Sequence, residues 1–170
     1  MILVRRALNG VRRTWSEWMK AYTVFVDIDC SRERVIELFD NVDNLQKWQT
    51  GLKSFKHLSG EPGQVGAISE IIFKHGRHLI EMTETITERN LPDEFNGFYE
   101  WSGGRNTLVN RFVELGPNST RWESTCDYQF SGFMIRAMAF LFPGMFKKQN
   151  QLFLDNFKAF CEDGTDVRDK

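Results

Sequence analysis

Residues 120–161 read TRWESTCDYQFSGFMIRAMAFLFPGMFKKQNQLFLDNFKAFC, and the periodicity of this stretch changes at Gly132. Before Gly132, polar and apolar side chains alternate, which is typical of a strand with one buried face. After Gly132, apolar residues return every three or four positions, which predicts a helix over 133–161. Pro143 should kink or divide this helix, because proline lacks the amide hydrogen and clashes with the preceding turn. The residues expected near one face of the helix are Phe142, Phe146, Gln149, Phe153, Asn156, Phe157 and Phe160.

The part of the chain before this stretch alternates in short segments that turn residues separate. Glycine and proline mark each break, because glycine adopts positive φ and proline fixes φ for a turn. Short connections between consecutive strands imply antiparallel hairpins. A first strand over 22–29 precedes two short helices, which begin after an N-cap at Ser31 and end before Gly51. The later strands are expected at about 52–58, 66–75, 77–89, 94–102, 105–115 and 120–131.

This order predicts an α+β fold in which a curved antiparallel sheet of seven strands surrounds the long C-terminal helix, with two short helices between strands one and two. A lipocalin-like barrel is the competing fold, and it would lack the early helix pair. The length of 170 residues suits one domain, which we place at 21–163. Residues 1–20 form a basic amphipathic extension, and residues 164–170 form a polar tail.

Several soft motifs accompany this order of elements, and they lie between residues 20 and 163. They are Ser31 after the first strand, Phe39-Asp40 at the end of the first helix, Asp43 with Trp48, Gly66, Leu91-Pro92, and Pro143 followed by Leu154, Phe157 and Lys158. On these residues the chain resembles the SRPBCC, or START-like, superfamily with its helix-grip fold, and within it the polyketide cyclase/dehydrase branch. The resemblance implies an apolar or amphipathic ligand held between sheet and helix. It also implies activities that range from lipid, sterol or quinone binding to polyketide cyclisation.

Composition and charge exclude several classes of protein. The 22 Lys and Arg residues nearly balance the 23 Asp and Glu residues, which argues against a nucleic-acid binder. No apolar run reaches the length of a membrane span. The three cysteines are far apart in the sequence, which favours reduced thiols in a cytoplasmic protein. The unusual feature is an excess of rings, with 15 Phe, five Trp and three Tyr, and these are expected to line the inner faces.

The expected inner faces of the strands and helix combine apolar walls with a few polar groups, as small-molecule sites do. Each polar group would cost free energy if it were buried without a partner, so it must bond to a neighbour, to water or to a ligand. The alternative is a plain core, in which the rings fill space and the polar groups bond to one another. The predicted ligand-binding residues are Ile80, Met82, Glu84, Tyr99, Trp101, Asn110, Trp122, Ser124, Cys126, Tyr128, Phe146, Gln149 and Phe153.

Glu84 is the best candidate for chemistry, with Tyr99 and Tyr128 as further catalytic candidates. A carboxyl group among apolar side chains would have a raised pKa, which suits a general acid or base. A shift of the strand register by one residue would instead place Glu84 in solvent. His75 and His78 flank an expected turn at Gly76 without further ligands nearby, so we predict no metal and no cofactor.

These observations support three hypotheses about function. The first is a protein that binds, transports or sequesters an apolar or amphipathic small molecule such as a lipid, quinone or polyketide. The second is a cyclase or dehydratase that uses acid/base chemistry in the same cavity. The third concerns residues 1–18, where apolar side chains form one helical stripe among basic residues. Such a helix can dock on an anionic membrane or on a partner, resemble a targeting peptide, or pack on the domain, and these residues can also be an over-long start.

Overall fold

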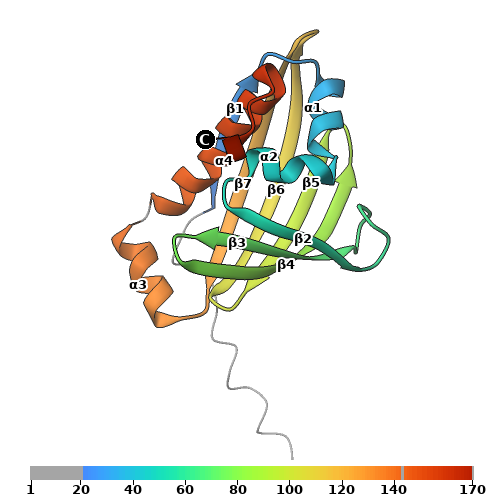
Figure 1. Ribbon diagram of the computed structural model, residues 1–170. Helices are drawn as coiled ribbons and strands as arrows, with labels where there is room; N and C mark the ends of the chain where they lie inside the picture. The colour runs from blue at the N-terminus through green and yellow to red at the C-terminus, as the bar shows by residue number, and fades with distance from the viewer. Residues whose placement is uncertain (1–20, 143, 170) are drawn as a thin grey trace, which may run out of the picture.

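The computed structural model of the protein describes residues 21–142 and 144–169 (Figure 1). The predicted extension at 1–20, with its membrane contact at 1–18, lies outside the described residues. The elements are β1 (Tyr22–Ile28), α1 (Arg32–Phe39), the 3-10 helix η1 (Val42–Asn44), α2 (Leu45–Trp48), β2 (Leu52–Ser59), β3 (Ile68–His75), β4 (His78–Asn90), β5 (Glu94–Trp101), β6 (Gly104–Gly116), β7 (Ser119–Phe130), α3 (Phe133–Leu141), α4 (Met145–Asp163) and the 3-10 helix η2 (Val167–Asp169).

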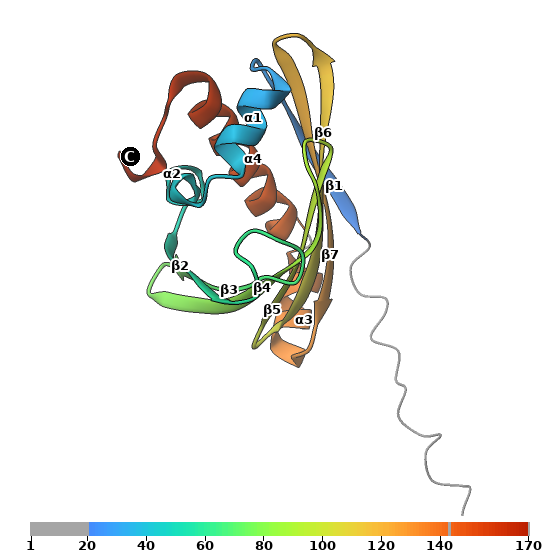
Figure 2. The same cartoon turned by 90° about the vertical axis from the view of Figure 1, so that its right-hand side faces the viewer.

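The seven strands form one antiparallel sheet in the order β1-β7-β6-β5-β4-β3-β2. Figure 2 shows this sheet from the side, with β2, β3 and β4 curling away from the plane of β1, β6 and β7. Helix α4 lies in the concavity that results. Register shifts within the β2–β3, β4–β5 and β6–β7 pairs favour this curvature, because an extra residue in one strand bends it. The predicted α+β helix-grip architecture is confirmed, with both short helices between β1 and β2.

The early helices form where the sequence predicts them. The Ser31 side chain accepts a hydrogen bond from the Arg34 amide at 3.4 Å, which satisfies one free donor at the start of α1. Val35 and Leu38 are buried on the inner side of α1. The buried Asn44 donates from Nδ2 to the Leu38 carbonyl at 3.0 Å, which joins the end of α1 to the next turn.

The predicted C-terminal helix is divided, as expected from Pro143, but the division has a larger effect than a kink. Helix α3 ends at Leu141 and α4 begins at Met145. Phe142 therefore lies in the connection, where its side chain is 60% exposed. The prediction that Phe142 shares the packed face of one helix is wrong, because the helical register does not continue through this connection. Within α4 the buried residues are Leu154, Asn156, Phe157 and Phe160.

Part of the aromatic excess forms a solid core at the end of the sheet that α1 and α2 cover. Phe39 packs edge-on against Phe112 with the ring centroids 4.9 Å apart. Phe157 from α4 packs against Trp122 at 5.1 Å and against Trp48 at 5.3 Å. Edge-to-face contacts of this kind stabilise aromatic pairs beyond the area that they bury. The core joins α1, α2, β6, β7 and α4, and so fixes one end of the helix over the sheet.

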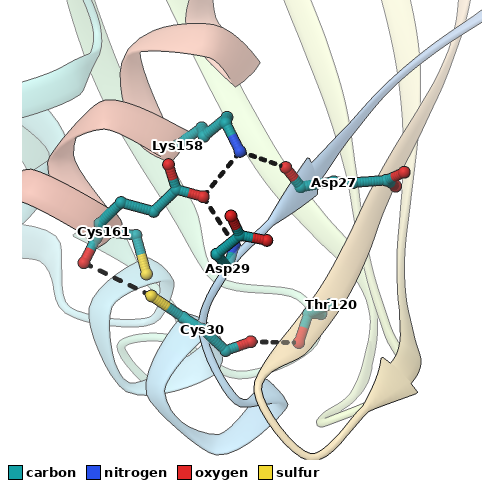
Figure 3. Close-up of polar contacts among 7 residues, drawn as sticks. Asp27, Asp29, Cys30, Thr120, Lys158 and Cys161 are labelled. Carbon is teal, nitrogen blue, oxygen red and sulfur yellow. Dashed lines mark hydrogen bonds and ion pairs between the residues drawn. The ribbon is translucent and has the colours of Figure 1, made fainter.

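Hydrogen bonds tie the second half of α4 to the edge strand β1 (Figure 3). The Lys158 ammonium donates to the Asp27 carbonyl and to the Glu162 carboxylate, each at 2.6 Å. The same Glu162 oxygen accepts a hydrogen bond from the Asp29 amide at 2.6 Å. These charge-assisted contacts hold α4 at a fixed position along β1.

The cysteines of this region are free thiols. Cys30 donates from Sγ to the carbonyl of Cys161 at 3.5 Å, as Figure 3 shows. The Cys30 carbonyl accepts a hydrogen bond from the Thr120 hydroxyl at 2.9 Å. Burial raises the pKa of the Cys161 thiol above its ordinary value of 9.0. The connection from β1 to α1 is therefore bonded to both α4 and β7.

Candidate functional site

A cavity of about 410 Å³ lies between the concave face of the sheet and helix α4. Its volume is within the range of roughly 300–1,000 Å³ that small-molecule sites occupy. The early helices contribute Phe39 and Trp48 to its wall, and α4 contributes Phe153 and Leu154. Most of the lining is apolar, as expected for a site that holds an apolar or amphipathic molecule.

The strands contribute to the cavity through the alternation that the sequence shows. In β4, Glu84 and Ile86 point to the concave side, and Glu84 faces Ser69 of the neighbouring β3. In β6, Leu108 and Asn110 point the same way. The register that places Glu84 inside is therefore the one that the structure adopts, with Glu84 only 9% exposed.

Glu84 and Tyr99 form a hydrogen-bonded pair in the cavity wall. They are direct cross-strand neighbours on β4 and β5, and the Tyr99 hydroxyl donates to Glu84 Oε1 at 2.5 Å. Burial raises the pKa of Glu84 above its ordinary value of 4.5, and the hydrogen bond from Tyr99 opposes part of that rise. Burial, together with the neighbouring Glu84, also raises the pKa of Tyr99 well above 10.0. The pair can therefore hold a proton in an apolar environment, which is a property of general acids and of hydrogen-bond donors to a ligand.

Gly97 explains how the ring of Tyr99 reaches Glu84. A Cβ atom at Gly97 would lie 2.9 Å from Tyr99 Cε2 and 3.0 Å from its hydroxyl oxygen. The ring of Tyr99 thus leans along its own strand over the bare Cα of Gly97, two residues earlier. This close approach is open only to glycine without movement of the ring.

Asn110 is the centre of a second polar group, which is satisfied within the protein. Its Oδ1 accepts hydrogen bonds from the Trp122 indole at 3.0 Å and from the Ser124 hydroxyl at 2.9 Å. Its Nδ2 donates to the Phe95 carbonyl at 3.0 Å. These residues line the cavity, but their polar atoms already have partners. They shape the wall and need no ligand to satisfy them.

Asn150 of α4 organises a third polar group at the other side of the cavity. Its Nδ2 lies 2.8 Å from Cys126 Sγ, 2.9 Å from the Tyr22 hydroxyl and 3.3 Å from the Tyr128 hydroxyl. Burial raises the pKa of Cys126 to about 11 and that of Tyr128 to about 12. At neutral pH the Cys126 thiol is therefore protonated, which is the inert form.

The indole of Trp48 is the unsatisfied donor of the cavity wall. Trp48 is 3% exposed, and its Nε1 has no hydrogen-bond partner among residues 21–142 and 144–169. A buried donor without a partner costs about 1–3 kcal/mol. Trp48 contributes to the cavity wall, but its Nε1 atom is itself closed off from solvent.

The open end of the cavity carries an ion pair. Arg89 binds Asp40 through two parallel hydrogen bonds, both of 2.6 Å. Both residues line the cavity and both side chains are partly exposed, which places the pair where the cavity meets solvent. Bidentate pairs of this kind are geometrically specific, so the pair fixes the end of α1 against β4 at this opening.

The structure brings six of the predicted ligand-binding residues together around the cavity and places the other seven elsewhere. The predicted residues that line it are Glu84, Tyr99, Asn110, Trp122, Ser124 and Phe153. Beyond the cavity, rings fill the far end of the fold, where Tyr128 and Phe146 pack with centroids 4.9 Å apart. Ile80 is 37% exposed near the β3–β4 turn. The predicted residues that are absent from the lining are Ile80, Met82, Trp101, Cys126, Tyr128, Phe146 and Gln149.

Sequence reasoning did not find the part of the wall that lies outside the long strands and α4. Phe39 and Trp48 come from the short helices, and Phe55 and His57 come from β2. The helical spacing of apolar residues in α1 indicates a packed face, but it does not say which ring ends at the cavity. That information depends on how the helices cross the open end of the sheet.

Metal binding finds no support in the described part of the chain, where no cluster of three or more His, Cys, Asp and Glu residues is arranged for a metal ion. His75 and His78 pair across the turn between β3 and β4, and both are exposed. Among the described residues, no helix has the length and apolar character needed to cross a membrane.

Comparison with known proteins finds similarity in structure and none in sequence. No family model and no curated protein matches the chain. The protein TTHA0849 from Thermus thermophilus superposes with a TM-score of 0.70 at 14% identity, over 84% of this chain and 97% of that one. The Zhui aromatase/cyclase from Streptomyces sp. R1128 superposes with a TM-score of 0.67 at 11% identity, over 88% and 99%. Norcoclaurine synthase from Thalictrum flavum, solved with a transition-state analogue, gives 0.64 at 12% identity, over 84% and 93%.

These similarities define the class of the fold. The chain has a helix-grip fold, and the fold that the sequence resemblance implied is confirmed. At identities of 11–14% the likeness extends to the fold alone. Function must therefore be argued from the cavity itself.

Proposed function

We propose that the protein binds, and carries or sequesters, an apolar or amphipathic small molecule such as a lipid, a quinone or a polyketide, in the cavity between the sheet and α4. The observation that carries this proposal is a cavity of about 410 Å³ whose wall is mostly apolar but includes a buried carboxyl group. Apolar walls supply affinity through burial, and a few placed polar groups orient the ligand. The three free thiols are consistent with action in the cytoplasm.

The polar groups that remain open to a ligand are few. Glu84 uses Oε1 to accept from Tyr99, which leaves its second carboxyl oxygen for a ligand. A ligand with a hydrogen-bonding group along an apolar body would pair with that oxygen. This pattern favours an amphipathic molecule over a pure hydrocarbon, because a hydrocarbon offers no hydrogen bond to the second oxygen of Glu84.

Native mass spectrometry of the protein purified without detergent tests the proposal. We expect a bound mass that solvent extraction recovers as an apolar or amphipathic compound. Leu108→Trp replaces an aliphatic side chain of the cavity wall with a large indole ring and should remove the bound species. Thr107→Trp adds the same ring at the exposed neighbouring position and should leave binding unchanged. Failure of both the native protein and Thr107→Trp to retain or take up any such compound contradicts the proposal.

The pair formed by Glu84 and Tyr99 supports a second candidate, a cyclase or dehydratase that uses acid/base chemistry. Two of the three catalytic candidates converge in the cavity within hydrogen-bond distance, as such a mechanism requires. The third, Tyr128, does not line the cavity. In this mechanism a protonated Glu84 donates its proton to a substrate oxygen and later recovers one, while Tyr99 holds the carboxyl group in place.

A panel of poly-β-ketone thioesters tests the enzymatic candidate, with the absorbance of cyclised aromatic products as the readout. We expect a loss of about 10²–10⁴-fold in rate for Glu84→Gln if Glu84 is the acid. The Thr107→Trp variant serves as the control. A rate equal to that without protein for the whole panel removes this candidate and leaves ligand binding as the function.

A further inference from the structure

Helix α3 presents an apolar surface to solvent, which we call the α3 surface. Phe133, Phe140 and Leu141 stand at positions i, i+7 and i+8 and therefore share one face of the helix. They are 89%, 75% and 67% exposed, and the adjoining Phe142 is 60% exposed. Ala139, which lies on another side of the helix, is only 6% exposed. Contiguous large apolar side chains at this level of exposure mark an interaction site.

The sequence segment that contains α3 carries charge of one sign. Residues 128–154 contain no Asp or Glu, and they contain Arg136, Lys147 and Lys148, which gives this segment a charge of +3. Lys147 and Lys148 are exposed at the start of α4, directly after the apolar residues. Residues 1–20 carry five basic residues and one acidic residue, a charge of +4. The net charge of −1 leaves −8 for all other residues, so these two segments are net positive while the rest of the chain is net negative.

The described chain begins at the end of the molecule that carries α3. The described chain begins beside β7, where Tyr22 pairs with Cys126 and its ring stacks on Tyr128 with centroids 6.2 Å apart. Tyr128 packs in turn against Phe146 in the first turn of α4, at 4.9 Å. In Figure 1, α3 projects from the body of the protein at this end. The first described strand therefore begins close to the start of α4, which directly follows the α3 surface.

We propose that the α3 surface docks on a membrane surface that contains anionic lipids. Large apolar side chains beside lysines and without acidic residues match the boundary between acyl chains and anionic headgroups. A second copy of the chain would place positive charge against positive charge across a two-fold contact. Coverage of α3 by residues 1–20 of the same chain would also bring two positively charged segments together. Helix α3, with nine residues, is too short to span a bilayer and would lie in the interface.

Sedimentation with vesicles tests this proposal on the full chain. We expect binding to vesicles of phosphatidylcholine with phosphatidylserine, weaker binding to phosphatidylcholine alone, and weakening by salt. Phe140→Ser with Leu141→Ser should reduce the partition about tenfold or more, because two apolar side chains no longer insert. Phe25→Ser with Leu115→Ser is the matched control. It removes the same two residue types at positions that are 53% and 49% exposed elsewhere, and it should bind as the native chain does.

Several outcomes would overturn the proposal. One is an absence of binding of the native chain to any vesicle. Another is equal binding by the Phe140→Ser, Leu141→Ser variant, combined with loss of binding in Arg12→Glu, Arg13→Glu, which would assign membrane contact to residues 1–20. A third is a native dimer that Phe140→Ser and Leu141→Ser convert to a monomer without vesicle binding in either form, which would assign the surface to a second copy. Circular dichroism shows whether each variant retains the native fold.

Discussion

Glu84 and Tyr99 face each other across β4 and β5, and a hydrogen bond of 2.5 Å joins the Tyr99 hydroxyl to Glu84 Oε1. The pair supplies oriented hydrogen-bonding groups within a wall that is otherwise mostly apolar. Its carboxyl group is buried, so it favours the protonated state more than an exposed glutamate does. A proton kept in this position can be shared with a ligand, whether the protein only binds that ligand or also transforms it.

Replacement of Glu84 by Gln should change how stability depends on pH. The folded-state pKa of Glu84 is raised above 4.5, so the folded protein binds more protons than the unfolded chain once the pH rises above about that value. The contribution of Glu84 to the free energy of unfolding therefore falls as pH increases from the unfolded pKa to the folded pKa. Glu84→Gln removes this dependence and should gain stability relative to the native protein over that window. Urea unfolding of both proteins from acid to neutral pH measures the difference, and parallel pH profiles would refute it.

Tyr99→Phe should raise the pKa of Glu84 further. The hydroxyl of Tyr99 lowers the pKa of Glu84 by donating to the carboxylate, while burial raises it. Removal of the hydroxyl removes the hydrogen bond that lowers the pKa of Glu84, so only the effect of burial remains. Carbon-13 NMR of the glutamate carboxyl groups, with Glu84→Gln to assign the signal, follows the titration directly. A pKa that falls or stays the same in Tyr99→Phe would show that the hydrogen bond does not act in solution.

Gly97→Ala should disturb the same pair from a distance of two residues. The new methyl group would lie 2.9 Å from the ring of Tyr99, so the ring must move away from its position beside Glu84. We expect a loss of about 1–3 kcal/mol in the free energy of unfolding, as overpacking typically costs. Gly116→Ala is the matched control, because nothing lies within 4 Å of a Cβ atom at that position. Equal stability of the two variants would show that the ring adjusts freely.

The sequence was sufficient to predict the order of elements and the inner faces of β4, β5 and β7, because alternation reports directly on burial within a strand. Glu84, Tyr99 and Ser124 were placed correctly on the concave side by this rule. The boundaries of the cavity could not be predicted in the same way. Alternation continues along β7 to Tyr128 and Phe130, yet those rings pack with Phe146 into a solid region. Whether a ring of β7 borders a cavity or fills a core depends on which side chains of the C-terminal helix pack against it. That helix is divided between α3 and α4, whereas the periodicity of the sequence placed its apolar residues on one face.

Asn110→Ala should destabilise the protein without removing any apolar contact of the core. Asn110 Oδ1 accepts from both Trp122 and Ser124, and both of these residues are buried. Truncation leaves two buried donors without a partner, so we expect a loss of about 2–4 kcal/mol in the free energy of unfolding. Asn118→Ala, in the exposed turn between β6 and β7, should change the free energy of unfolding by no more than about 0.5 kcal/mol. Urea unfolding monitored by tryptophan fluorescence measures both variants.

A double variant tests the hydrogen bond between Ser124 and Asn110 directly. Ser124→Ala in the Asn110→Ala background should recover part of the loss, because one of the two unpaired donors is then absent. A fully additive further loss in the double variant would mean that the hydrogen bond between Ser124 and Asn110 does not contribute to stability.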